Sequence, residues 1–194
     1  NSETIEVGSN YTDAGATATD NYDGNITNNI QVTGNVNTNI VGTYTLTYNV
    51  SDASNNQANT VSRTINVVDT TIPVITLTGS NSETIEVGSN YTDAGVTATD
   101  NYDGDITNII QVTGNVNTNI VGTYTLTYNV SDASNNEAST VSRTINVVDT
   151  TIPVITLIGN ESETIEVGSN YTDTGATATD NYDGDITNII QVTG

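Results

Sequence analysis

Carboxylates are the side chains of this sequence whose number and spacing could do chemistry. The chain has 23 Asp and Glu residues against two Lys or Arg, no His or Cys, and a net charge of −21. The usual zinc ligands are therefore missing, and so are most general bases and nucleophiles. Oxygen ligands such as carboxylates favour Ca²⁺. The composition leaves two kinds of chemistry: binding of a divalent cation, or catalysis by paired carboxylates.

The charge also limits the partners of the chain. With so few basic side chains to neutralise phosphates, we expect no binding to nucleic acid and no direct contact with a membrane. The absence of Cys removes disulfides as a source of rigidity in a small extracellular module, so another stiffening device is expected.

An internal repeat organises the chain. The segment NSETIEVGSNYTDAG begins at Asn1 and again at Asn81, and ESETIEVGSNYTDTG begins at Glu161, which gives a period of 80 residues. The first two copies differ only at positions 16, 25, 29, 57, 59, 78 and 80. A period of this length is too long for most solenoids and indicates a row of modules that each have their own core.

Module boundaries are expected at the segment Asp-Thr-Thr-Ile-Pro, residues 69–73 and 149–153, because proline suits a linker or the first residue of a strand. Residues 1–69 then form a module without its first strand, 70–149 a complete module, and 150–194 the N-terminal half of a third. Either the sequence is a window onto a longer polymer, or neighbouring identical chains complete the cut modules by exchanging strands.

The complete module reads as short strands with alternating polar and apolar residues. We expect strands at 73–77, 84–87, 95–99, 108–113, 122–131 and 138–148, with a weaker edge candidate at 115–119. About seven strands in 80 residues predict an all-β fold of tandem immunoglobulin-like β-sandwich modules.

Several charged residues within these strands have predicted environments. Arg143 shares parity with Val141 and Ile145, so it should point inward unless a bulge intervenes or its head reaches water at the edge of the sandwich; a binding role is the alternative. Asp93 is expected to cap a turn toward the opposite pole. The pair Glu83 and Glu86 is expected on a solvated outer face.

Two stretches of the complete module carry a family resemblance. The segment ATDNYDGDIT (98–107) and the segment from YNVSDASNN to SRTINVVDTTIPVITL (128–157) resemble bacterial Ig-like surface-protein repeats related to the hyalin-repeat group. This resemblance covers essentially the whole chain. It implies an extracellular or cell-surface location and a role as spacer or stalk in adhesins, surface filaments or secreted enzymes. A Gly usual in the hairpin turn is Asn here (Asn55 or Asn56, Asn135 or Asn136), and Asn tolerates the left-handed backbone.

Immunoglobulin topology predicts where the carboxylates gather. The loop after the second strand, the hairpin turn before the last strand and the preceding linker should meet at one pole of each module. In the complete module these segments carry Asp69, Asp100, Asp103, Asp105 and Asp132. Clustered carboxylates repel unless a cation holds them, so we predict Ca²⁺ there; capping of turns by Asp is the alternative, and both can hold at once. The corresponding residues in the other copies are Asp20, Asp23, Asp52 (with Asn25 in place of an Asp), Asp149, Asp180, Asp183 and Asp185.

These features favour a structural function over two others. Near-identical tandem copies suit a spacer, stalk or filament shaft, whose partners are neighbouring modules and possibly identical chains. A module that binds a glycan or a protein is the alternative, with Tyr91 and Tyr102 as candidates to stack on sugar. A glycosidase with paired carboxylates is disfavoured, because a small sandwich offers no deep cleft and every copy would duplicate the site.

Overall fold

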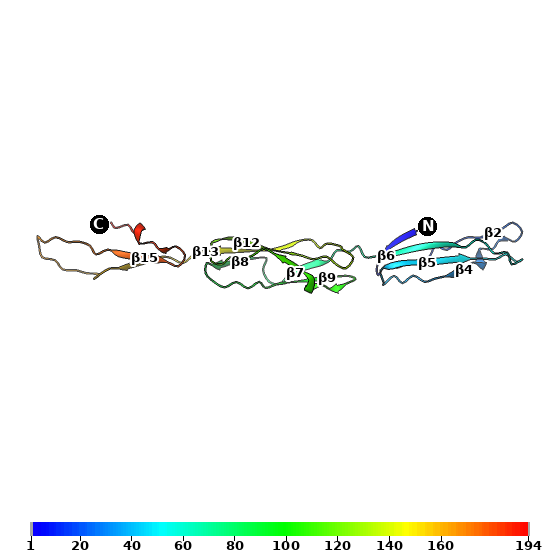
Figure 1. Ribbon diagram of the computed structural model, residues 1–194, viewed down its shortest axis with the longest axis horizontal. Coiled ribbons are helices and arrows are strands. Elements are labelled where there is room, and N and C mark those ends of the chain that lie inside the picture. Colours follow the sequence, from blue (N-terminus) through cyan, green and yellow to red (C-terminus); the bar gives the residue numbers. More distant parts are fainter. Residues whose placement is uncertain (1, 194) are drawn as a thin grey trace. The chain divides into compact units, whose positions relative to one another are not determined.

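The computed structural model describes residues 2–193 and contains strands and short 3-10 turns (Figure 1). The chain divides into two compact units, one made of Asn1–Thr76, Thr97–Ile110 and Asn129–Ser139, the other of Leu77–Val96, Gln111–Tyr128 and Thr140–Gly194. The fold is all-β, with tandem immunoglobulin-like β-sandwich modules, as the alternation predicted.

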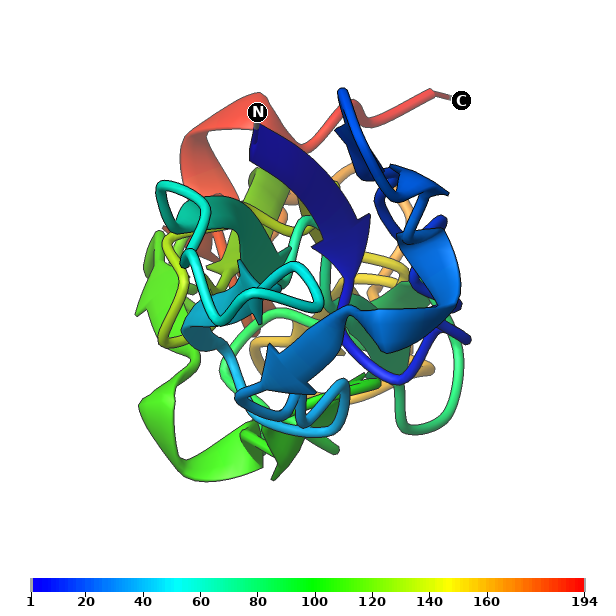
Figure 2. The same cartoon turned by 90° about the vertical axis from the view of Figure 1, so that its right-hand side faces the viewer.

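The first copy lies in the first unit and forms a four-stranded sheet in the order β1-β6-β5-β4, with a separate β2-β3 ribbon. Strand β1 runs parallel to β6, whereas β5 is antiparallel to both of its neighbours. Figure 2 gives a second view of this sheet, with β1 as the dark blue arrow. The elements are β1 (Ser2–Glu6), β2 (Thr19–Asp20), β3 (Gly24–Asn25), η1 (Thr27–Asn29), β4 (Gln31–Thr33), β5 (Gly42–Asn49) and β6 (Val61–Val68).

The second copy repeats this pattern and adds an opening strand. Its sheets have the orders β11-β12-β13-β8 and β10-β9-β7. The elements are β7 (Val74–Leu77), β8 (Ser82–Glu86), β9 (Val96–Asp100), β10 (Gly104–Asp105), η2 (Thr107–Ile109), β11 (Gln111–Thr113), β12 (Gly122–Asn129) and β13 (Val141–Val148). The third copy forms the sheet β14-β15-β16 from β14 (Val154–Leu157), β15 (Ala176–Asp180) and β16 (Gly184–Asp185), followed by η3 (Thr187–Ile189).

Alternation along the hairpin strands builds the cores. In β5, Leu46 and Tyr48 are buried while Thr47 between them is more exposed, and β12 repeats the pattern. In the first copy these two side chains pack with Val7, Ile65 and Val67. Period-two patterning therefore predicted correctly which face of each long strand is buried.

Two predicted strands in the middle of the module are wrong or too long. Residues 107–109 form the turn η2, and only Gln111–Thr113 is a strand. The cause is local, since Asp105 Oδ1 accepts the Thr107 N–H at 3.0 Å and starts the turn. Segment 115–119 contains no strand in the described structure, because the Asn117 side chain accepts the Asn119 N–H at 3.1 Å. Short polar side chains here compete with sheet pairing.

The hairpin turn uses asparagine as expected. Asn135 has φ of +67° and Asn55 has φ of +66°, so each occupies the left-handed region that glycine would favour. The turn closes with a hydrogen bond from the Asn135 N–H to the Asp132 carbonyl at 3.2 Å.

Arg143 lies in the core, and its head does not reach water. The side chain is 0% exposed, and it forms ion pairs with Glu83 at 3.0 Å and Asp93 at 3.1 Å. Its Nη2 also donates to the carbonyls of Thr78 at 2.7 Å and Gly95 at 3.0 Å. The predicted bulge or edge position is therefore wrong: β13 pairs with β12 in continuous register through Arg143.

The two acidic partners of Arg143 correct two further expectations. Glu83 is not simply a solvated surface residue, because β8 pairs in parallel with β13 and places it beside the guanidinium. Asp93 pairs with Arg143 and accepts the Tyr128 hydroxyl at 2.9 Å. In the other copies the matching aspartate also caps a turn, as Asp173 does for the Gly175 N–H.

Candidate metal centre

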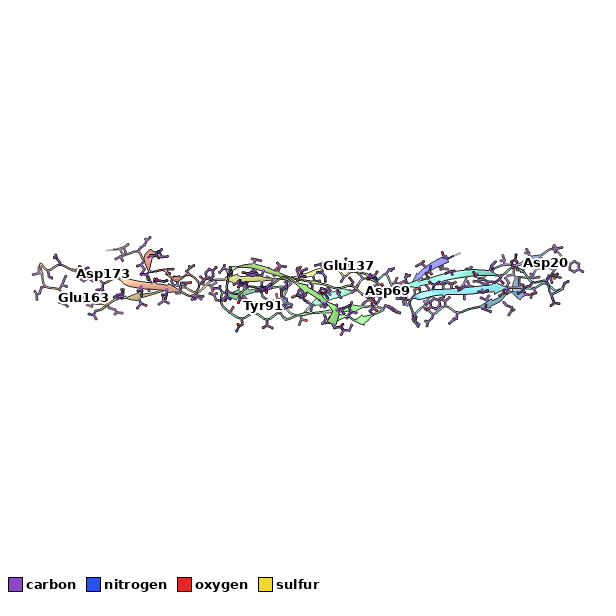
Figure 3. The ribbon with its side chains drawn as sticks, in the orientation of Figure 1. Asp20, Asp69, Tyr91, Glu137, Glu163 and Asp173 are labelled. Carbon is purple, nitrogen blue, oxygen red and sulfur yellow. The ribbon has the colours of Figure 1, made fainter. Side chains whose placement is uncertain are left out.

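Four aspartates meet at one pole of the complete module. Asp100 ends β9, Asp103 follows in the loop to β10, Asp132 lies in the turn between β12 and β13, and Asp69 follows β6. One oxygen of each carboxylate lies within 4.8 Å of one oxygen of each of the other three. All four residues belong to the first compact unit, and Asp20 and Asp69 lie at opposite ends of the first copy (Figure 3).

Hydrogen bonds from the backbone orient these carboxylates. Asp100 Oδ1 accepts the N–H groups of Tyr102 at 2.8 Å and Asp103 at 3.0 Å. Asp103 Oδ2 accepts the Ala133 N–H at 2.8 Å, which ties the first loop to the hairpin turn. Asp132 Oδ1 accepts the Asn136 N–H at 2.8 Å. Turn capping and assembly of a carboxylate cluster thus occur together.

Two buried oxygens of the cluster have no hydrogen-bond partner in the described structure. They are Asp69 Oδ2 and Asp100 Oδ2, and Asp69 is only 5% exposed. Burial raises the pKa of Asp69, and the charges of Asp100 and Asp132 raise it further. Ionised aspartates held this way are costly unless a cation compensates them. Their oxygens are the donor type that Ca²⁺ takes.

The same arrangement recurs in the other copies. Asp20, Asp23 and Asp52 bring their oxygens together in the first copy, and each is half-buried. Asp149, Asp180 and Asp183 do so in the third copy. Burial raises the pKa of Asp149, with a further contribution from Asp180, and its buried Oδ1 has no partner in the described structure.

Asp105 and Asp185 lie outside these clusters, against expectation. Asp105 Oδ1 accepts the Thr107 N–H, Asp185 accepts the Thr187 N–H at 2.9 Å, and Asn25 does the same for Thr27. Each side chain is used by the turn that follows it, which explains why Asp and Asn are interchangeable at this position.

Glu6 and Glu86 contribute to the linkers, and sequence reasoning missed them. Glu86 was expected on a solvated face, yet its carboxylate accepts the N–H groups of Thr150 at 3.0 Å and Thr151 at 3.1 Å and both hydroxyls. Glu6 accepts the Thr70 N–H and the hydroxyls of Thr70 and Thr71, whereas the Thr71 N–H donates to Asp69 Oδ1 at 3.3 Å. The sequence feature that could have predicted this role is the Thr-Thr pair that recurs after each module, because it offers two hydroxyls and two N–H groups to a carboxylate.

These bonds, led by the Thr150 hydroxyl, lower the pKa of Glu86 from 4.5 to about 2. A lowered pKa in the folded state contributes stability that is present above the unfolded pKa and is lost as pH falls through the folded pKa. The stability that the hydrogen bonds from Thr150 and Thr151 to Glu86 contribute should therefore be lost as pH falls from about 4.5 to about 2.

Removing Glu86 should loosen this linker. In Glu86→Ala we expect amide hydrogen exchange at Thr150 and Thr151 to accelerate about fivefold, because each N–H loses its carboxylate acceptor. Nuclear magnetic resonance measures this directly. The matched control is Glu166→Ala, since Glu166 occupies the same position in the third copy and is exposed. Unchanged exchange at both threonines would show that the Glu86 carboxylate does not stabilise the linker.

The tyrosines considered for stacking on sugar contact the protein through their hydroxyl groups. Tyr91 is half-buried, and its hydroxyl lies 3.5 Å from Asp93 Oδ1. The Tyr102 hydroxyl accepts the Val41 N–H of the first copy at 3.4 Å, whereas the equivalent Tyr22 is 91% exposed. In the part of the chain that the structure describes, no helix is long and apolar enough to cross a membrane.

Comparison with known proteins agrees with this fold. A family model described as "Bacterial surface protein, Ig-like domain" matches residues 1–67, 75–147 and 155–194. Hyalin of Strongylocentrotus purpuratus is 34% identical over 148 residues, which cover 71% of this chain and 12% of hyalin. The serine-rich adhesin for platelets of Staphylococcus aureus strain N315 is 33% identical over 168 residues, which cover 79% of this chain and 7% of the adhesin.

The matched region is thus a small part of these curated relatives. Among solved structures, the lipoprotein BT2262 of Bacteroides thetaiotaomicron is 29% identical, with a TM-score of 0.38, over 41% of this chain and 39% of the lipoprotein.

Proposed function

Because the chain belongs to the family of bacterial surface protein Ig-like domains, we propose that it is a non-enzymatic spacer, a segment of the stalk or shaft of a secreted or cell-surface protein. Near-identical copies supply length, which is what such a segment needs. The acidic exterior keeps neighbouring chains apart and soluble.

The observation that carries this proposal is that a glutamate accepts hydrogen bonds from the following linker in two successive copies. Glu6 binds the linker at Thr70 and Thr71, and Glu86 does the same 80 residues later. At the first linker the following module also contributes, since Asn136 Nδ2 donates to the Asp69 carbonyl at 3.1 Å. A linker bound on both sides resists bending, and this is a property that a spacer needs and that an isolated binding module does not.

A divalent cation completes the proposed junction, and the oxygen-only ligands favour Ca²⁺. Asp69, Asp100, Asp103 and Asp132 would supply the ligands at the first linker, and Asp149, Asp180 and Asp183 at the second. Asp69 belongs to the linker and the other three to the module that follows it. A shared cation would therefore tie the linker to that module. Extracellular sites of this kind bind Ca²⁺ with Kd on the order of 10⁻⁴–10⁻³ M.

Distance measurements between two spin labels test the spacer function. The chain has no cysteine, so Asn59→Cys and Asn115→Cys, both at exposed positions of different copies, accept labels uniquely. We expect a narrow distance distribution in millimolar Ca²⁺ and a broader one in excess chelator. A distribution that is equally broad in both conditions would contradict a stiff spacer. A narrow distribution in both conditions would show that no cation is needed for stiffness. The spacer proposal would then rest on the hydrogen bonds from the linkers to Glu6 and Glu86.

A glycan-binding module is the competing function. Stacking on sugar needs aromatic faces free for the ligand. Tyr91 is half-buried, whereas Tyr102 is 38% exposed and the equivalent Tyr22 is 91% exposed, so glycan binding stays the alternative to the spacer.

A further inference from the structure

Asp69 is the member of the four-aspartate cluster that the linker contributes, and residues on both sides of it fix its position. It follows β6, whose last residue Val68 lies opposite Glu6 in the parallel ladder with β1. Asp69 is 5% exposed, and its buried Oδ2 has no hydrogen-bond partner in the described structure. A buried carboxylate oxygen without a donor points to a cation as its missing partner.

Glu6 holds the two residues that follow Asp69. Its carboxylate accepts the Thr70 N–H at 3.1 Å, the Thr70 hydroxyl at 2.6 Å and the Thr71 hydroxyl at 2.9 Å. The Thr71 N–H donates to Asp69 Oδ1 at 3.3 Å. Two adjacent threonines therefore connect the carboxylate of Glu6 to that of Asp69, although Glu6 lies outside the four-aspartate cluster.

The second linker shows the same threonine N–H with the other acceptor. The Thr151 N–H donates to Glu86 Oε1 at 3.1 Å, and Asp149 Oδ1 is buried without a hydrogen-bond partner in the described structure. The N–H of the second threonine can therefore be accepted either by the linker aspartate or by the glutamate. A cation that takes both oxygens of the aspartate would not leave this N–H without an acceptor, because the glutamate lies beside it.

We propose that Glu6 positions Asp69 to bind the cation of the first linker, and that Glu86 does the same for Asp149 at the second. This inference rests on the cation site of the proposed function, and it adds a residue outside the ligands that sets the affinity of the site. Without the glutamate, both threonines lose an acceptor. The cation itself must then immobilise the linker aspartate, which costs conformational entropy.

The coupling between glutamate and cation has to act in both directions, because two linked equilibria change each other by the same factor. If the hydrogen bonds of Glu6 raise the affinity for the cation, binding of the cation must stabilise those hydrogen bonds equally. In the parent chain, Ca²⁺ should therefore slow hydrogen exchange at the Thr70 N–H. A role of Glu6 in the stability of the first copy alone would not produce this slowing.

Calcium titration of the full chain, followed by nuclear magnetic resonance, tests the proposal site by site. The Asp103 N–H donates to Asp100 in the first cluster and the Asp183 N–H donates to Asp180 in the second, so these amide signals report the two linkers separately. The variant with alanine at position 6 should bind Ca²⁺ about fivefold more weakly at the first linker only, the equivalent of one net hydrogen bond. The variant with alanine at position 86 should show the same loss at the second linker only. The Thr70 N–H of the parent chain should exchange about fivefold more slowly in Ca²⁺.

Two further variants separate positioning from charge. Glu3→Ala removes the same charge from an exposed position of β1, so it measures the effect of charge alone. Glu6→Gln also removes the charge but keeps one oxygen that accepts hydrogen bonds, so it should lose less affinity than Glu6→Ala.

The outcomes distinguish the role of Glu6 from the existence of the site. If Ca²⁺ shifts neither reporter signal in the parent chain, both the cation site and its positioning by glutamate are ruled out. If the parent chain binds Ca²⁺ and Glu6→Ala loses no more affinity than Glu3→Ala, the role of Glu6 is ruled out and the cation site stands. Equal losses at both linkers in Glu6→Ala would also rule out this role, because the effect would then not be local.

Discussion

The substitution Arg143→Met should lower the free energy of unfolding of the complete module by about 2–3 kcal/mol. Removing one partner of a fully buried ion pair costs about 3–5 kcal/mol, and the carboxylates left here are 33% and 27% exposed, so water solvates them in part. Arg143 is 0% exposed, and its loss leaves Glu83 and Asp93 without their shared cation. The carbonyls of Thr78 and Gly95 lose a donor at the same time. Met matches the volume of the aliphatic stem, so the effect reports on the charge and the hydrogen bonds.

The matched control is the equivalent substitution in the first copy. Arg63 is 19% exposed, pairs with Asp13 at 2.8 Å and donates to the Gly15 carbonyl, so Arg63→Met leaves one carboxylate and one carbonyl without their partner, about half of what Arg143→Met leaves. We expect less than half the loss found for Arg143→Met. Hydrogen exchange at the amides of β12 and β13, compared with β5 and β6, assigns each loss to its own copy. Equal losses at the two positions would show that burial of the guanidinium does not decide its contribution.

Calcium should stabilise the chain against thermal unfolding at neutral pH. If Kd is on the order of 10⁻⁴ M, then 10 mM Ca²⁺ is about 100 times Kd and adds about 2.7 kcal/mol per site. Excess chelator should remove this gain. If the unfolding midpoint is the same in Ca²⁺ and in chelator, the clustered aspartates bind no Ca²⁺ and serve only to cap turns.

Two variants separate a cation site from general effects of charge. In chelator, Asp69→Asn should raise stability, because it removes a buried carboxylate whose pKa is raised by burial and by Asp100 and Asp132. In Ca²⁺ the same variant should lower stability, because a ligand is lost. Asp105→Asn should respond to Ca²⁺ as the parent chain does, since Asp105 lies outside the cluster and only caps Thr107. The cation site is identified if Asp69→Asn raises stability in chelator and lowers it in Ca²⁺, and Asp105→Asn shows no such reversal.

Local pattern determined the strands of this protein. The alternation of Tyr124, Leu126 and Tyr128 predicted a half-buried strand, and β12 follows it. The left-handed Asn135 was predictable because the backbone preference belongs to the residue itself. The order of the strands then predicted that Asp69, Asp100, Asp103 and Asp132 would lie at one pole, and the structure brings their oxygens within 4.8 Å.

The roles of the remaining acidic residues were decided only by the tertiary structure. Glu83 and Arg143 are 60 residues apart in the chain, and Glu86 and Thr150 are 64 apart. Both pairs form because β8 lies parallel to β13, and this register places Glu83 opposite Ile145 and Glu86 opposite Val148. The sequence shows which strands are present and which face is apolar. It does not show the register of a parallel pair, because that register depends on how the whole core packs.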